Sequence, residues 1–350
     1  MVKCVILSDG FGLNKVLGYT FIDKFINDHG FIDKFYVVID KKRLMEYKEK
    51  IDSKVDYIYR KDIKDIHKYL SSDDIVIVIS DKVVFKSVID SKYIDSKMLY
   101  KYRDYLYIFP FKDLNKKKKF KEIKVEVYDE NVYEIKRKII RENNLSFINK
   151  GVDIIDIDST YIDYGCTIKG GTIIYPNSYI KNNSKIGARC CIDGTIDGCT
   201  IKDNVTIKNS CVEHSIIDEN VSVGPYCYIH EDCLIKVGSI IGSYVELKKS
   251  IIGCRCKVKH QSVLLDCIVG DDVNIGAGVI TANYDGKMKH ISKINDKSFV
   301  GCNSVIISPI EIGSNCFVAA DTTVVKDVEN NSFAISRVSQ MNKVINKVAI

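Results

Sequence analysis

The feature that most constrains the fold is a six-residue period in the second half of the chain. Aliphatic residues recur at every sixth position over long stretches, and neither an α-helix nor an ordinary β-strand has such a period. The recurring positions are Ile168, Ile174, Ile180, Ile186 and Ile192, then Val223, Ile229, Ile235, Ile241 and Leu247, and later Ile294, Val300, Ile306, Ile312, Val318 and Val324. Repeats of this length are typical of a parallel β-helix, whose triangular coils stack their aliphatic side chains in the centre.

The first part of the chain has a different pattern. Residues 3–7, 34–39, 55–60 and 73–80 are short apolar runs of strand type. Helix-like stretches, residues 16–30 and 42–51, separate some of them. This alternation predicts a small α/β domain, with a parallel sheet covered by helices.

These two patterns predict the organisation of the whole chain. We expect an α/β domain over residues 1–124 and a β-helix over residues 151–343, followed by a tail, residues 344–350. Between the domains, residues 129–144 place apolar residues on one face after an acidic start, which favours a linker helix within residues 125–150.

Composition and charge exclude several classes of protein. The 350 residues are 46% hydrophobic and 28% charged, as in ordinary globular proteins. No apolar run approaches the roughly 18 residues of a membrane span, and the start lacks the features of a signal peptide. We therefore expect a cytoplasmic protein with no membrane partner. The net charge of +6 is modest, and its densest basic run, Lys116–Lys119, has no aromatic platform beside it, so no nucleic-acid partner is expected.

The thirteen cysteines are scattered along the chain and favour reduced, buried side chains. Two close pairs, Cys190 with Cys191 and Cys254 with Cys256, raise the alternative of a metal site. Neither pair has a second pair at zinc-site spacing, so the metal interpretation is the weaker one.

Residues 281–289, TANYDGKMK, interrupt the six-residue period between Ile280 and Ile294. The insert must leave the coil as a loop, and loops on rigid scaffolds are where binding residues concentrate. A tolerated insertion without function is the alternative.

The residues around this insert resemble a known family. The NYDG loop, the FVG coil and the terminal AISR segment occur in the order and at the separations found in the acetyltransferase domain of the bacterial bifunctional N-acetylglucosamine-1-phosphate uridyltransferase/glucosamine-1-phosphate acetyltransferase family. The likeness runs from about Asn149 to Lys343. It implies a left-handed β-helix, a homotrimer with active sites between subunits, acetyl-CoA as cofactor and an amino-sugar phosphate as substrate.

The resemblance also implies roles for individual residues. His260 falls at the position of the catalytic base, and Glu246 at a position that supports it. Without the resemblance, a lone histidine is more often structural. The substrate-binding residues implied are Lys248 and Lys289 for the phosphate, Asn274 for the sugar, and Asn283 and Tyr284 for the acetyl group and sugar. Those implied for coenzyme A are Cys302, Ala320, Arg337 and Lys343.

Two departures from the family leave the identity of the acceptor open. Tyr228 stands where the family has a phosphate-binding arginine, and Val263 where it has a tyrosine. Loss of one charge-assisted contact to a phosphate costs about 1.5–3 kcal/mol.

The start of the chain, ILSDGFGLNKVL, resembles a nucleotidyltransferase signature in shortened form. Gly10, Gly12 and Lys15 match it, whereas Asp9 places an acid where a phosphate should lie. Asp81 falls at the place of the family's magnesium-binding aspartate and Asp129 near a second ligand, but no uridine-recognising stretch is present. We therefore expect a reduced, Rossmann-like domain without activity, which needs Mg²⁺ only if it is active.

Three hypotheses follow from the sequence. The leading one is an acetyl-CoA-dependent N-acetyltransferase acting on glucosamine 1-phosphate for UDP-N-acetylglucosamine synthesis. The second is an enzyme that also transfers uridylyl groups. The third is a trimeric scaffold without catalytic activity.

Overall fold

The computed structural model describes residues 1–8, 10–60, 66, 68–71, 74–81, 84–85, 89, 94, 100–103, 105–110, 121–122, 125, 127–128, 131–337 and 339–342. The chain forms two compact units, Met1–Glu142 and Asn143–Ile350. Helix α3 (Val132–Ile148) contains the division between them, whereas the sequence predicted one linker over residues 125–150. Asp9, Asp129, Lys116–Lys119, Lys343 and the tail of residues 344–350 lie outside the described residues.

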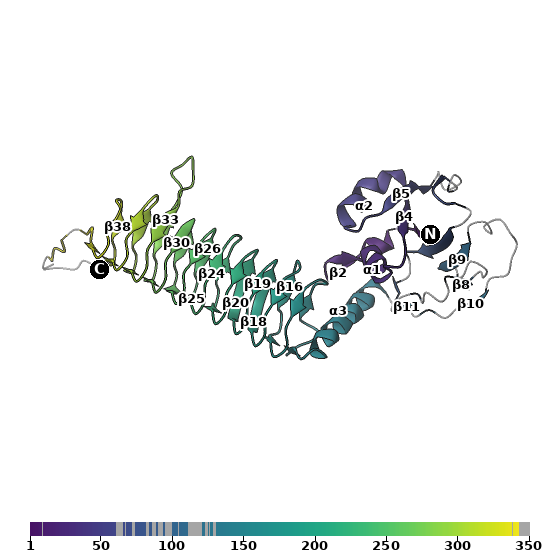
Figure 1. Cartoon of the computed structure of the whole chain (residues 1–350), viewed down its shortest axis with the longest axis horizontal. Coiled ribbons are helices and arrows are strands. Elements are labelled where there is room, and N and C mark those ends of the chain that lie inside the picture. Colours follow the sequence, from purple (N-terminus) through teal and green to yellow (C-terminus); the bar gives the residue numbers. More distant parts are fainter. Residues whose placement is uncertain are drawn as a thin grey trace, which may run out of the picture. The chain divides into compact units, whose positions relative to one another are not determined.

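The first unit contains a seven-stranded sheet in the order β10-β8-β9-β6-β1-β4-β5 (Figure 1). Strand β1 pairs in parallel with both β4 and β6, and β4 pairs in parallel with β5. Strand β9 is antiparallel to β6 and β8. The strands of this sheet are β1 (Val2–Leu7), β4 (Lys34–Ile39), β5 (Asp56–Tyr59), β6 (Ile75–Ser80), β8 (Tyr100–Tyr102), β9 (Leu106–Pro110) and β10 (Lys121–Glu122). The four predicted strands are thus confirmed, and the sheet is mixed at one edge.

One predicted helix of this unit is shorter than expected. Helix α1 (Phe21–Asp28) begins only after Thr20, whose side chain accepts from the backbone N–H of Asp23 and closes a capping box. The preceding residues instead form the antiparallel strands β2 (Lys15–Val16) and β3 (Tyr19–Thr20), because Leu17 and Gly18 make the turn with positive φ. The second helix, α2 (Leu44–Lys50), is confirmed and follows a 3-10 turn, η2 (Lys41–Arg43). The remaining elements are η1 (Phe11–Leu13) and the antiparallel pair β7 (Val84–Phe85) and β11 (Val127–Tyr128).

The second unit is a parallel β-helix, as the six-residue period predicted (Figure 1). Each regular coil contributes two strands to a 19-stranded sheet, which forms sides 1 and 2, and one to a 9-stranded sheet, which forms side 3. Sides 1 and 2 meet at the first corner, and sides 2 and 3 meet at the second corner.

The strands of the three sides follow one another in each coil. Side 1 contains β12 (Asp153–Ile154), β15 (Ile173–Ile174), β22 (Ser222–Val223), β25 (Ile240–Ser243), β28 (Lys257–His260), β31 (Asn274–Ile275), β34 (Phe299–Val300), β37 (Phe317–Val318) and β39 (Phe333–Ala334). Side 2 contains β13 (Tyr161–Ile162), β16 (Tyr179–Lys181), β23 (Tyr228–Ile229), β26 (Glu246–Lys248), β29 (Val263–Leu265), β32 (Ile280–Ala282), β35 (Val305–Ile307) and β38 (Thr323–Val324). Strands β18 (Cys191–Asp197) and β20 (Thr206–Glu213) run through both sides. Side 3 contains β14 (Thr167–Ile168), β17 (Lys185–Ile186), β19 (Thr200–Ile201), β21 (Ile216–Ile217), β24 (Leu234–Ile235), β27 (Ile251–Ile252), β30 (Cys267–Val269), β33 (Ser292–Ile294) and β36 (Glu311–Ile312).

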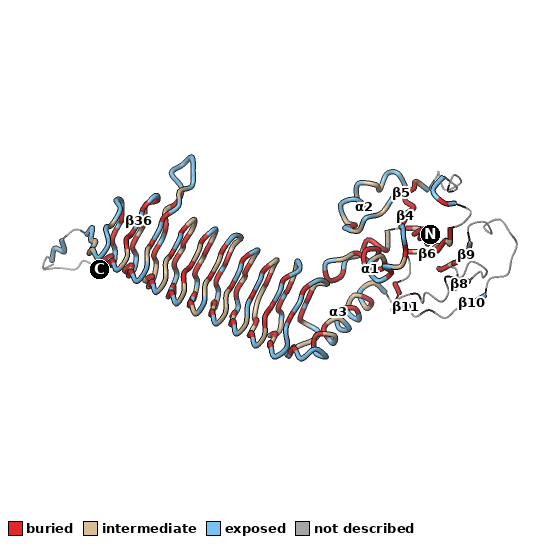
Figure 2. Tube along the Cα trace, viewed as in Figure 1, coloured by how far each residue is buried: buried red, intermediate tan, exposed pale blue. Residues whose placement is uncertain are grey.

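The recurring aliphatic residues form the core of the β-helix. Ile180, Val223, Leu247 and Val300 are all fully buried, and buried positions alternate with exposed ones along every coil (Figure 2). Because the core is filled in this way, the residues that face outward are free to differ between coils, and the candidate site is built from them. Among the described residues, no helix is both long and apolar enough to span a membrane.

Candidate functional site

The first corner aligns several of the predicted site residues in one column. Successive backbone hydrogen bonds join the coils there: Gln261 N–H to Ser243, Gly278 N–H to His260, Asn303 N–H to Ala277, and Asp321 N–H to Cys302. The column therefore runs Ser243, His260, Ala277, Cys302 and Ala320. His260 thus shares one edge of the β-helix with the predicted coenzyme residues Cys302 and Ala320, although His260 and Ala320 are sixty positions apart in the sequence.

His260 ends strand β28 and is exposed. Its backbone is fixed by the parallel pairing with Ser243 and by the hydroxyl of Ser262, which donates to its carbonyl at 3.0 Å. Within the described part of the chain, its imidazole has no hydrogen bond or ion pair. The ring is therefore available to a substrate, as a general base must be.

Glu246 was predicted to support His260, but in the single chain its carboxylate bonds another histidine. His230 Nε2 lies 2.9 Å from Glu246 Oε1, and the ring of His230 lies 3.8 Å from that of Tyr228. His230 was not among the residues predicted from the sequence. The signal that could have found it is register, since Tyr228 and Glu246 occupy equivalent positions on neighbouring coils.

Lys248 is the phosphate-binding residue predicted on the same strand, and it is already paired. Its ammonium lies 3.0 Å from Glu231 Oε1. This hydrogen bond lowers the pKa of the Glu231 carboxyl. A phosphate that binds Lys248 must therefore displace or share this partner.

The second corner brings Lys248 near the root of the inserted loop. The backbone N–H of Asp266 donates to the Lys248 carbonyl, and Asn283 Nδ2 donates to Asp266 Oδ2 at 2.5 Å. Asn283 is buried, whereas the residues that follow it are exposed. The side-chain amide of Asn283 thus anchors the loop to Asp266.

The loop itself projects from the coils between β32 and β33 (Figure 1). Tyr284 and Lys289 form an antiparallel bridge across it, and Asp285 closes its tip. The Asp285 carboxylate accepts from His290 at 2.8 Å and from two backbone N–H groups, and this bonding, chiefly that of His290, lowers its pKa. Lys289 is exposed, without an ion pair among the described residues. The loop therefore presents Tyr284 and Lys289 on an ordered frame.

Asn274 and Arg337 lie away from these two corners. Asn274 faces outward from side 1, where it is aligned with Lys257 and Phe299. Arg337 is exposed beyond the last strand, β39. One chain thus places His260 at the first corner and Lys248 with the loop at the second, with β29 of side 2 between them.

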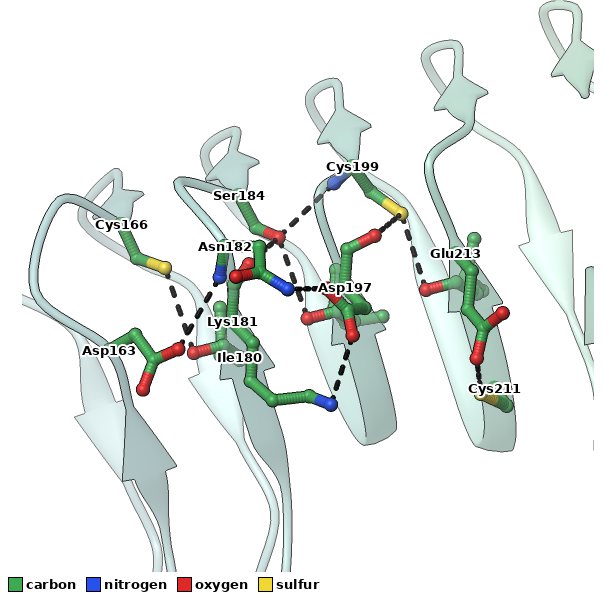
Figure 3. A network of polar contacts seen from close by, with 12 residues as sticks. Asp163, Cys166, Ile180, Lys181, Asn182, Ser184, Asp197, Cys199, Cys211 and Glu213 are labelled. Carbon is green, nitrogen blue, oxygen red and sulfur yellow. Dashed lines mark hydrogen bonds and ion pairs between the residues drawn. The ribbon is translucent and has the colours of Figure 1, made fainter. Parts of the chain in front are cut away.

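The coils that precede the candidate site carry a different kind of surface. Side chains there pair with one another from coil to coil, as Lys181 does with Asp197 at 2.9 Å (Figure 3). Asn182 also donates to Asp197. These groups satisfy each other, whereas His260, Lys289 and Cys302 have no such partner within the described residues.

In the first unit, the glycine turn that resembles a phosphate-binding signature is occupied by the protein itself. Asp81 Oδ2 accepts the backbone N–H groups of Gly10 and Gly12, each at 3.1 Å, and the hydroxyl of Ser8. Gly10 has φ +100°, and a Cβ there would collide with the guanidinium of Arg43. The donors that should face a phosphate thus face a buried carboxylate instead.

Metal ligation finds no support in the described residues. They contain no group of three or more His, Cys, Asp or Glu side chains arranged to hold an ion, and this includes the described surroundings of Asp81 and of both cysteine pairs. Burial raises the pKa of the Cys256 thiol to about 11. Such thiols remain protonated and act as small core residues.

The comparisons with known proteins match the C-terminal part of the chain. The family model described as the GMPPB C-terminal domain matches residues 157–235 and 211–284. The bifunctional protein GlmU of Clostridium kluyveri is 40% identical over 209 residues, which is 59% of this chain and 46% of that protein. The bifunctional protein GlmU of Thermosipho melanesiensis is 42% identical over 211 residues, 60% of this chain and 47% of that protein. The match thus spans slightly less than half of each relative.

Among solved structures, a mutant perosamine N-acetyltransferase from Caulobacter crescentus is 19% identical, with a TM-score of 0.29, and the match covers 33% of this chain and 53% of that one. This likeness is too low to bear on function. The relatives at about 40% identity confirm, for the C-terminal part of this chain, the resemblance to the bifunctional uridyltransferase/acetyltransferase family.

Proposed function

We propose that the protein is an acetyl-CoA-dependent N-acetyltransferase that converts glucosamine 1-phosphate to N-acetylglucosamine 1-phosphate, a step towards UDP-N-acetylglucosamine. The observation that carries the proposal is the first-corner column, which aligns an unpaired, exposed His260 with Cys302 and Ala320. The similarity of this part of the chain to GlmU proteins supports it.

The residues of the column fit a long, linear cofactor. From His260 to Ala320 the column rises three coil steps, about 4.8 Å each. Ala277, Cys302 and Ala320 are small, and the last two are exposed, so the edge offers a shelf without bulky side chains. Arg337, beyond the last coil, adds a cation for phosphate groups. Coenzyme A supplies the acetyl group as a thioester when it is bound.

His260 would act on the acceptor amine. An amino sugar must lose a proton to attack a carbonyl carbon, so a neutral imidazole within hydrogen-bond reach speeds the reaction. Attack forms the N–C bond, the C–S bond breaks, and the proton taken by His260 can pass to the departing thiolate. Lys289 and Tyr284, on the ordered loop, would hold the sugar phosphate.

We also propose that the protein acts as a homotrimer. In one chain, His260 and the loop residues lie at different corners, separated by side 2. Contact between copies would bring the first corner of one chain to the second corner of another, and so complete the site. Light scattering should give three times the mass of the chain. A monomer with full acetyl transfer would contradict this arrangement.

The first unit is proposed to lack uridylyl transfer. A nucleotide triphosphate would have to compete with Asp81 for the N–H groups of Gly10 and Gly12. Since both substrates of the acetyl transfer are intracellular metabolites, the site of action proposed is the cytoplasm.

The function is tested by following thioester loss with several acceptors. Purified chain should acetylate glucosamine 1-phosphate faster than glucosamine at equal concentration, because Lys289 would contact the phosphate. Absence of acetyl transfer to every amino-sugar phosphate would favour the scaffold hypothesis instead.

A further inference from the structure

A second candidate site lies in the coils that precede the acetyl-transfer region. The aliphatic residues on either side of the first corner pair from coil to coil: Ile174 with Ile192 and then Ile207 and Val223 on side 1, and Ile180 with Ile196 and then Val212 and Ile229 on side 2. All eight are fully buried. The interior therefore continues without interruption through these coils.

The first corner of these coils, in contrast, varies in length. From Ile174 to Ile180, and again from Val223 to Ile229, the chain takes six residues to round the first corner. From Ile192 to Ile196 it takes four, and from Ile207 to Val212 it takes five. Strands β18 and β20 consequently run straight through, with a register shift between Ile192 and Gly194. Two successive corners are cut back, and a notch is left between the full corners on either side.

The walls of the notch are aromatic. Tyr175 stands on one side and Tyr226 on the other, and both line the hollow. Tyr226 is 57% exposed and stacks on Tyr244, with ring centroids 5.3 Å apart. Tyr175 precedes Pro176 and Tyr226 follows Pro225, so proline restricts the backbone beside each ring. The Tyr226 ring is therefore held on one face by Tyr244, and the backbone beside both rings is restricted.

The floor of the notch is polar and carries balanced charge. It contains Asp193 and Thr206 from the shortened coils, together with Lys208 and Asn209. Within the described residues, the side chains of Asp193, Lys208 and Asn209 make no hydrogen bond or ion pair with other side chains. This contrasts with side 2 of the same coils, where Lys181 and Asp197 pair with each other. One carboxylate and one ammonium give the floor no net charge, which favours a neutral ligand.

We propose that this notch is a binding site for a saccharide. A pyranose presents C–H groups on its faces and hydroxyl groups around its edge. Its faces suit the exposed tyrosine rings, and its hydroxyls can both donate to Asp193 and accept from Lys208 and Asn209. Aromatic walls with a few convergent polar groups are the usual composition of a small-molecule site. The notch lies on the first corner in the coils before His260, since the backbone N–H of Tyr244 donates to Pro225 and that of Tyr226 to Asn209. None of its lining residues is among those assigned to acetyl transfer.

The test is a calorimetric titration of the full chain with chitotriose and, separately, with maltotriose, both uncharged saccharides. We expect weak binding of at least one of them to the wild type. Tyr226→Ala should lower the affinity about tenfold, since it removes a ring on which the saccharide would stack. Tyr226→Phe keeps the ring and should retain most of the affinity, which guards against a loss caused by misfolding. Tyr161→Ala is the matched control, because Tyr161 is an exposed tyrosine stacked on Tyr179 outside the notch.

Three results would overturn the proposal. One is the absence of binding of both saccharides by the wild type. Another is an equal loss of affinity in Tyr161→Ala and Tyr226→Ala. The third is tighter binding of uridine monophosphate, lost in Tyr226→Ala, which would assign the notch to a nucleotide.

Discussion

Two places in this chain carry residues that match ligand-binding motifs, and they differ in whether their polar groups are already bonded within the chain. In the first unit, the backbone donors of Gly10 and Gly12 are satisfied by the buried carboxylate of Asp81. In the β-helix, His260 and Cys302 lie along an exposed corner and keep their side chains unpaired among the described residues. The donors of the glycine turn are thus occupied, whereas the side chains of the first-corner column are free within the described part of the chain. The sequence motifs alone do not reveal this difference.

The largest effect is expected at His260, in the first-corner column. His260→Ala should lower kcat for acetyl transfer by roughly 10²–10⁴ and leave KM for acetyl-CoA nearly unchanged, because it removes the proton acceptor but not the cofactor shelf. Steady-state kinetics measure both constants. His214→Asn is the control, since His214 is exposed in the β-helix outside the first-corner column. Near-full kcat in His260→Ala would remove His260 from the catalytic role.

The loop should affect binding more than chemistry. Lys289→Ala is expected to raise KM for glucosamine 1-phosphate roughly ten- to hundredfold, with a small change in kcat, because the phosphate does not change during the reaction. Lys287→Ala provides the comparison, since only the backbone N–H of Lys287 bonds Asp285. Equal kinetics of the two variants would contradict the proposed phosphate contact.

The glycine turn bonded to Asp81 should affect the stability of the first unit and not acetyl transfer. Asp81→Ala leaves the buried N–H of Gly12 without its acceptor and leaves that of Gly10 only a long bond of 3.4 Å to the Ser8 hydroxyl. The substitution should therefore lower the free energy of unfolding by about 1–3 kcal/mol. Acetyl transfer should be unchanged at temperatures where the variant stays folded. Urea denaturation, with hydrogen exchange to assign the loss to the first unit, measures the effect. An unchanged stability would show that Asp81 is not the structural acceptor of the glycine turn.

A smaller difference between the units concerns pH. Burial lowers the pKa of His29, whose Nδ1 donates to the Phe25 carbonyl while Nε2 accepts from the Ile89 N–H. The folded state therefore favours neutral His29, so its contribution to stability is present above the unfolded pKa of about 6.5 and falls as the pH drops below it. Hydrogen exchange at pH 7.5 and 5.5, corrected for intrinsic rates, should show destabilisation of the first unit that His29→Gln diminishes. An equal pH response in both proteins would count against His29 as its source.

The sequence predicted the β-helix well because its six-residue period marks the positions whose side chains pack in the core. Every position such as Ile180 or Val300 must point inward, so a six-residue spacing leaves few other folds. Contacts on the outside do not follow from that period. His230 and Glu246 lie sixteen residues apart and Lys248 and Glu231 seventeen, although the aligned strands there are eighteen residues apart, so these contacts run diagonally between coils. The bond between Asp81 and Gly12 joins residues sixty-nine positions apart, which no local pattern reveals.

The most direct test of the comparison between the two units uses one incubation of the full chain. Acetyl-CoA, glucosamine 1-phosphate, UTP and Mg²⁺ are supplied together, and the sugar products are identified by mass spectrometry. We expect N-acetylglucosamine 1-phosphate to accumulate, with free coenzyme A and without UDP-N-acetylglucosamine. Formation of UDP-N-acetylglucosamine, or the absence of any N-acetylated sugar, would contradict it.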